Sequence, residues 1–125
     1  MISLLEKNRI ISIIFTILIA AEIFFFSSLS GPPGARFPII SIAYHFIVFF
    51  LFAFFLLASI KGKGKIKLKY LIITIIVSIL YALSDEFHQS LISGRDAGIK
   101  DILTDTAGIF FSSLIYLYTN KKTNQ

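Results

Sequence analysis

The chain has 125 residues, of which 56% are hydrophobic, including 14 phenylalanines. A soluble domain of this length cannot bury so much apolar surface, so the composition indicates a membrane protein. The absence of cysteine excludes disulfides and thiolate metal sites. The net charge of +5 does not indicate a nucleic-acid partner, because the basic residues flank apolar runs instead of forming a soluble basic face.

Four apolar runs, each bounded by charges or turn residues, predict an all-α, polytopic bundle in one domain, residues 1–125. We expect the spans at about residues 10–29, 37–60, 70–90 and 101–118. About 20 apolar residues, at about 1.5 Å each, cross the hydrocarbon core of a bilayer. The first run could belong to a signal peptide, but its length and the lack of an A-x-A site favour an uncleaved helix.

The third apolar run, Tyr70 to Ser84, is too short to cross on its own. We therefore expect its helix to continue to residue 90, which draws Asp85, Glu86 and His88 toward or into the membrane. This expectation connects a hydrophobic pattern to the most polar part of the chain.

The placement of the basic residues predicts the orientation. Nine of the twelve lie in the N-terminus, the 61–69 connection and the C-terminus, and the other three are Arg36, Arg95 and Lys100. Positive residues in short loops stay preferentially in the cytoplasm. Both termini are therefore predicted to be cytoplasmic, and the lysine-rich 61–69 connection is interpreted as an orientation signal.

With this topology, polar residues from all four spans fall in the outer half of the bundle. They are Glu22, His45, Asp85, Glu86, His88, Gln89, Asp101 and Asp105. Burying a charge costs several kcal/mol, so ionisable residues in a membrane normally face the bundle interior and pair with one another. We therefore expect these residues to line one inward-facing polar pocket.

Helical spacing supports this arrangement, since residues three or four apart share a face. The two shared faces are Asp85, His88 and Gln89 on the third span, and Asp101, Asp105 and Gly108 on the fourth. Gly108, with Ala107 beside it, predicts a close approach of the fourth span to a neighbouring helix.

Arg95 follows Gly94 in the connection between the third and fourth spans. Its guanidinium could pair with the acids, which would make the polar cluster a structural salt-bridge network. It could instead bind a phosphate or carboxylate of a ligand through two parallel hydrogen bonds. The residues alone leave both readings open.

The histidines suggest two further kinds of chemistry. His88 or Glu86 could act as a general base, since a neighbouring carboxylate can orient an imidazole. Two histidines and several carboxylates could also hold a divalent cation. His45 and His88 lie on different spans, however, and match no metal motif such as HExxH, so we expect no metal and no cofactor.

The stretch DEFHQSLISGRDAGIKDILTDTAG resembles the signature of the VanZ-like family, with its D-E-x-H-Q segment, G-R turn, and Asp-Thr followed by Gly. Other matching positions are Ser27, Ser28, His45 and Phe46. The resemblance implies a small four-span protein of the bacterial cytoplasmic membrane. The family's namesake is associated with resistance to teicoplanin, an antibiotic that acts on cell-wall precursors outside that membrane, so the resemblance implies a role in the cell envelope.

We therefore expect an outward-facing pocket that binds or acts on an anionic envelope molecule, such as a lipid-linked wall precursor or a phospholipid head group. In this reading Arg95 contacts the anion, and the acids, histidines and Gln89 shape the pocket. The alternatives are a structural or partner protein whose polar cluster packs helices, an enzyme using His88 or Glu86 as a base, and an ion or proton pathway. The oligomeric state stays open.

Overall fold

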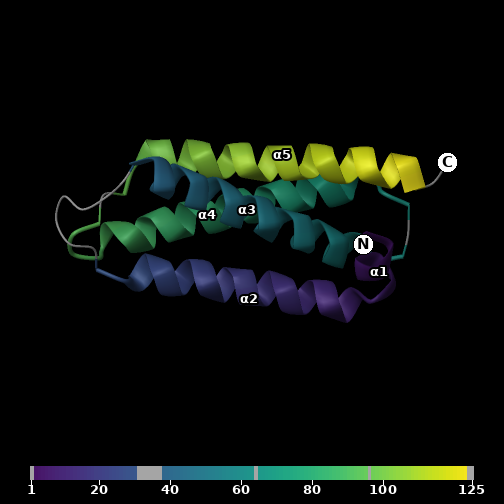
Figure 1. Ribbon diagram of the computed structural model, residues 1–125, viewed down its shortest axis with the longest axis horizontal. Coiled ribbons are helices and arrows are strands. Elements are labelled where there is room, and N and C mark those ends of the chain that lie inside the picture. Colours follow the sequence, from purple (N-terminus) through teal and green to yellow (C-terminus); the bar gives the residue numbers. More distant parts are fainter. Residues whose placement is uncertain (1, 31–37, 64, 96, 124–125) are drawn as a thin grey trace.

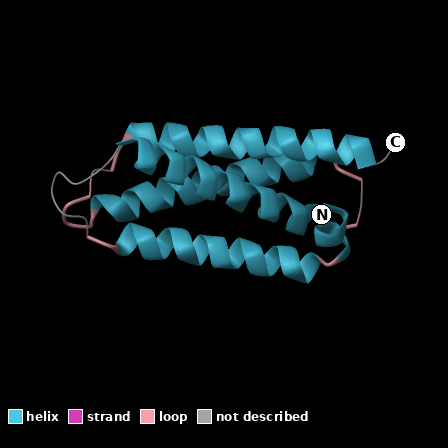
Figure 2. Cartoon of the chain, viewed as in Figure 1, coloured by secondary structure: helices cyan, strands magenta, loops and turns pink. Residues whose placement is uncertain are grey.

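The computed structural model describes residues 2–30, 38–63, 65–95 and 97–123. Within these ranges the chain forms helices and no strand (Figure 1, Figure 2). The helices are α1 Ile2–Lys7, α2 Arg9–Ser28, α3 Pro38–Lys61, α4 Leu68–Ser90 and α5 Ile99–Thr123. In this described part, α2 to α5 are each long and apolar enough to cross a membrane. The predicted all-α bundle of four spans is therefore confirmed.

The four long helices run side by side and define two ends of the bundle (Figure 1). One end, here called the terminal end, carries α1, the C-terminus and the connection between α3 and α4. The opposite end, here called the polar end, is where α2 and α4 finish and α3 and α5 begin. Both termini thus lie at the same end, while their cytoplasmic location stays a prediction.

The helix ends follow the local sequence. α4 runs to Ser90, so the acidic stretch that begins at Asp85 is helical, as its short apolar run predicts. Gly62, at a φ of 57°, ends α3 and donates its N–H to the Ala58 carbonyl at 3.1 Å. Gly94, at a φ of 78°, turns the chain between α4 and α5. Glycine takes positive φ values without steric cost, which explains its use at both turns.

α5 packs directly on the backbone of α3 at Gly108. A Cβ atom at this position would lie 2.4 Å from the Phe46 carbonyl oxygen and 3.1 Å from the Phe50 nitrogen. Only a residue without a side chain permits such an approach. The predicted close contact at Gly108 is confirmed. Ala107 beside it is exposed and is not part of this contact.

The centre of the bundle is built mainly from aromatic side chains of α3. Phe49 and Phe52 are buried together with Ile23 of α2 and Ile109 of α5. Tyr81 of α4 stacks on Phe52 with ring centroids 4.9 Å apart. Many large apolar side chains on the outer faces of the helices are exposed, and lipid would cover them in a membrane.

A second polar cluster lies at the terminal end and ties α1 to α3 and α5. The Glu6 carboxylate pairs with Lys61 at 2.7 Å and accepts hydrogen bonds from Tyr116 at 2.6 Å and Asn120 at 3.0 Å. Lys61 is only 6% exposed. Neither α1 nor a role for Glu6 is predicted from the sequence, so this cluster is new from the structure.

Candidate functional site

Polar side chains from four helices meet at the polar end. α2 supplies Ser27 from its last turn, α3 supplies His45 from its second turn, and α5 supplies Asp105 from its second turn. α4 supplies the Asp85–Gln89 stretch from its last two turns. These residues divide into two groups that differ in whether their polar atoms have partners.

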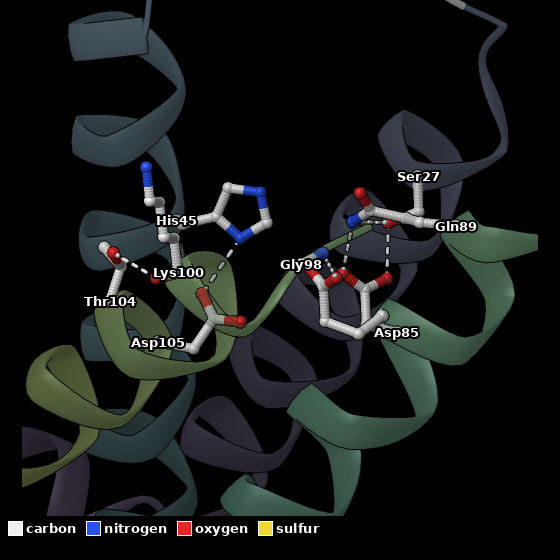
Figure 3. A network of polar contacts seen from close by, with 9 residues as sticks. Ser27, His45, Asp85, Gln89, Gly98, Lys100, Thr104 and Asp105 are labelled. Carbon is white, nitrogen blue, oxygen red and sulfur yellow. Dashed lines mark hydrogen bonds and ion pairs between the residues drawn. The ribbon is translucent and has the colours of Figure 1, made fainter. Parts of the chain in front are cut away.

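The first group, here called the Asp85 group, consists of Ser27, Asp85 and Gln89. Asp85 accepts hydrogen bonds from the Ser27 hydroxyl of α2 and, at 2.8 Å, from Nε2 of Gln89 (Figure 3). The same Nε2 lies 3.1 Å from the Ser27 oxygen, which closes a ring of three. All three residues are buried. Both carboxylate oxygens therefore have donors, and the group forms a complete link between α2 and α4.

The second group, here called the His45 group, consists of His45, Glu86 and Asp105. Nδ1 of His45 lies 2.9 Å from Oδ1 of Asp105, joining α3 to α5 (Figure 3). Oε2 of Glu86 accepts a hydrogen bond from the Gly98 N–H at 2.8 Å. One potential ligand atom from each member lies within 4.8 Å of the others. Three helices thus bring an imidazole and two carboxyl groups to one point.

This second group is not complete. Oε1 of Glu86 and Oδ2 of Asp105 are buried and have no hydrogen-bond partner among the described residues. Glu86 is 4% exposed and Asp105 is fully buried. An unpartnered buried acceptor costs about 1–3 kcal/mol, and more when it is charged. The His45 group therefore has the capacity to accept from a further donor or cation.

Arg95 bonds to the end of α2. Its Nε donates to the Leu29 carbonyl at 2.9 Å, and its Nη2 donates to the Phe26 carbonyl. The last carbonyls of a helix lack partners within it and carry partial negative charge, so Arg95 caps α2. The partners predicted for this guanidinium from the sequence are the acids or a ligand anion. The structure shows a third kind of partner, the backbone carbonyls of α2.

His88 lies on the α2 side of α4, apart from the His45 group. Its Nε2 is 3.0 Å from the Ser28 hydroxyl, and its ring stacks on Phe24 with centroids 4.8 Å apart. Ser28 donates its hydrogen to the Phe24 carbonyl at 2.7 Å, so the hydroxyl accepts from the imidazole. In this arrangement His88 is held in place between Ser28 and Phe24.

The remaining predicted residues lie at the edges of the site. Glu22 accepts a hydrogen bond from the Tyr44 hydroxyl at 3.1 Å, one helix away from the His45 group. Asp101 is half-buried in the first turn of α5. Tyr44 and Gly98 were not singled out from the sequence. Tyr44 directly precedes His45 and would have been found by extending the search to neighbouring hydroxyls, whereas a backbone N–H such as that of Gly98 leaves no sequence signal.

The sequence pattern of the VanZ/LLP1 family matches residues 6–120, which is nearly the whole chain. The chain belongs to the VanZ/LLP1 family. The match includes α2, α3, α4, most of α5 and both groups at the polar end, and it confirms the resemblance drawn from the sequence.

The family and the four apolar helices together make this VanZ/LLP1 chain a multi-pass membrane protein. No curated protein and no solved structure matches the chain.

Proposed function

We propose that this VanZ/LLP1 protein holds its polar end on the outer face of the bacterial cytoplasmic membrane and binds there an anionic envelope molecule. The class of ligand is a phosphate-bearing head group, of a phospholipid or of a lipid-linked wall precursor. The observation that carries the proposal is the pair of unpartnered oxygens in the His45 group, which can accept hydrogen bonds from the hydroxyl or amino donors of such a head group. A polar cluster that only packs helices is more stable when each of its buried polar atoms has a hydrogen-bond partner, as in the Asp85 group.

The basic residues of this end favour an anion as part of the ligand. Arg95 is half-buried beside the end of α2, and Lys100 is exposed in the first turn of α5. Guanidinium groups match phosphate geometry. The carboxyl groups of Glu86 and Asp105 would repel a phosphate unless hydroxyl or amino donors of the same head group, or a cation, lay between them. Head groups of envelope lipids combine phosphate with such donors.

Charge distribution supports the outward orientation. Nine basic residues lie in the segments of the terminal end, and the other three are Arg36 in the α2–α3 connection, Arg95 in the α4–α5 connection and Lys100 in the first turn of α5. Of these three, Arg36 lies outside the described residues. The association of the family's namesake with teicoplanin fits a ligand at the outer surface, and a wall precursor as ligand would link this protein to glycopeptide resistance.

Native mass spectrometry of the purified protein in detergent tests the proposal. Wild-type protein is expected to retain one phosphatidylglycerol or one polyprenyl-pyrophosphate-linked precursor per chain. Arg95→Ala should weaken that binding about tenfold or more, the value of one hydrogen bond to a charged group. Lys69→Ala removes a positive charge at the terminal end and should leave binding unchanged. Equal losses in both variants would indicate nonspecific charge attraction and contradict the proposal.

A structural role is the second candidate, and the Asp85 group favours it. This group is buried, satisfied and placed between α2 and α4, which is what a helix-packing device requires. The two roles can be divided between the two groups: the Asp85 group holds the bundle together, and the His45 group meets the ligand.

A further inference from the structure

The His45 group has features that a head-group site alone does not explain. His45, Glu86 and Asp105 come from α3, α4 and α5, and each is at least nine-tenths buried. Their ligand atoms lie within 4.8 Å of one another. Two oxygens, Oε1 of Glu86 and Oδ2 of Asp105, have no partner among the described residues. Two carboxyl groups and one imidazole thus lie together at one buried place, where two oxygens can still accept a hydrogen bond or bind a cation.

The nature of the missing partner follows from this donor set. Neighbouring carboxylates repel each other, and a single neutral donor would satisfy one oxygen and leave that repulsion. A divalent cation offsets both charges and coordinates several atoms at once. The geometry points to a divalent metal site, and we propose that His45, Glu86 and Asp105 bind one first-row cation, Zn²⁺ or Mn²⁺.

The choice among metals rests on the ligands. Imidazole suits zinc and other first-row metals, whereas Mg²⁺ and Ca²⁺ prefer sites made only of oxygen. Three protein ligands that include a histidine and carboxyl groups are typical of sites that keep a coordination position open. The proposed metal is therefore Zn²⁺ or Mn²⁺, with weaker binding of Mg²⁺.

The surrounding structure prepares the site. Two ligands bonded to one such cation lie at most about 4 Å apart, so the observed 4.8 Å requires a contraction of less than about 1 Å. The Gly98 N–H holds the other oxygen of Glu86, as outer partners of metal ligands commonly do. The close contact of Gly108 with Phe46 fixes the distance between the helices that carry Asp105 and His45.

The metal gives the proposed function a specific form. If the proposed function holds, an open coordination position would accept a phosphate oxygen of the head group, and the cation would bridge the acidic site to an anionic ligand. Metal binding itself does not depend on the head group. The sequence pattern predicts no metal, because the two histidines lie on different spans and match no metal motif. The proposal replaces that expectation with a site that uses His45 and leaves His88 out.

Metal analysis of the full chain in detergent tests this proposal without any lipid. Protein stripped with a chelator is titrated with Zn²⁺ and with Mn²⁺, and bound metal is counted by elemental analysis after desalting. One ion per chain is expected, with Mg²⁺ competing poorly. His45→Ala and Asp105→Asn should each weaken binding by about 10-fold to 100-fold or more, since even outer partners of a metal cost this much.

His88→Ala is the matched control, because it removes a histidine at the same end of the bundle that bonds to Ser28. It should keep one metal per chain. Circular dichroism shows whether each variant is folded, and the wild-type count stands even where a variant is not. Substoichiometric metal in the wild type, or loss in His88→Ala with retention in folded Asp105→Asn, would overturn the proposal. Stoichiometric metal without head-group binding would contradict the proposed function alone.

Discussion

Gly108 and Phe46 bring the backbones of α5 and α3 into direct contact, so that a Cβ on residue 108 would stand 2.4 Å from the Phe46 carbonyl oxygen. Phe46 follows His45 in the chain, and Gly108 lies one turn after Asp105. The contact therefore sets the separation of the two helices whose side chains form the 2.9 Å His45–Asp105 pair.

Gly108→Ala should destabilise the bundle. The new methyl group meets backbone atoms, which cannot rotate away, so α3 and α5 must separate. Overpacking of this kind typically costs about 1–3 kcal/mol. Thermal unfolding in detergent, followed by circular dichroism, measures the loss. Gly98→Ala is the control, because a Cβ there meets nothing within 4 Å. Equal melting temperatures for wild type and Gly108→Ala would show that the helices do not pack as described.

Asp85→Asn and Glu86→Gln should have different effects on the metal-free protein. Asp85 accepts two hydrogen bonds in a buried ring, and an amide cannot accept at both positions. We expect a loss of about 1–3 kcal/mol of stability. Glu86→Gln keeps an oxygen for the Gly98 N–H and replaces the unpartnered oxygen, so stability should stay equal or rise. The same unfolding assay compares them, and a larger loss for Glu86→Gln would contradict the division into two groups.

Cysteine labelling tests the orientation. The chain has no native cysteine, so single substitutions can be labelled on intact cells with an impermeant thiol reagent. Ser93→Cys, exposed at the polar end, should react from outside, and Lys65→Cys, exposed at the terminal end, should react only after the membrane is opened. The reverse pattern would place both termini outside and rule out an outward-facing site.

Arg95→Ala should abolish function while leaving the protein folded. A cation at a helix C-terminus contributes about 0.3–1 kcal/mol, so losing the bonds to Phe26 and Leu29 should lower stability only slightly. Membrane levels should be normal, and activity in an envelope-stress or glycopeptide assay should be lost. Lys69→Ala, which removes an exposed charge from the terminal end, is the control for net charge.

A different result would identify Arg95 as a structural residue. If Arg95→Ala unfolds in detergent, and a second change that neutralises an acid of the polar end restores it, the guanidinium is chiefly a counter-charge. Breaking a buried pair costs about 3–5 kcal/mol, well above the cap value.

Hydrophobic runs and turn residues predict the four spans because each span is long and apolar. The extension of α4 through Asp85 follows from length alone, and the close approach at Gly108 follows from the absence of a side chain. α1 could not be predicted, since a six-residue helix is below the length that forms without tertiary contacts. It depends on Glu6 and its partners from distant parts of the chain.

The pairing inside the site could not be predicted either. Helices that are apolar on every side carry little information about their rotation, so the pattern does not show which histidine meets which acid. In the structure His45 pairs with Asp105, and His88 hydrogen-bonds to Ser28. The bonds of Arg95 to backbone carbonyls could not be predicted from the sequence, because every residue carries the same carbonyl group.

The cluster around Glu6 has a consequence for how the protein is made. Glu6 emerges early from the ribosome, whereas Tyr116 and Asn120, which bond to it, come more than a hundred residues later. Until the fourth span has entered the bilayer, Glu6 lacks two of its three partners, Tyr116 and Asn120. Insertion of α5 therefore adds one link at each end, joining Asp105 to His45 and Tyr116 to Glu6. A chain truncated before α5 would have neither link.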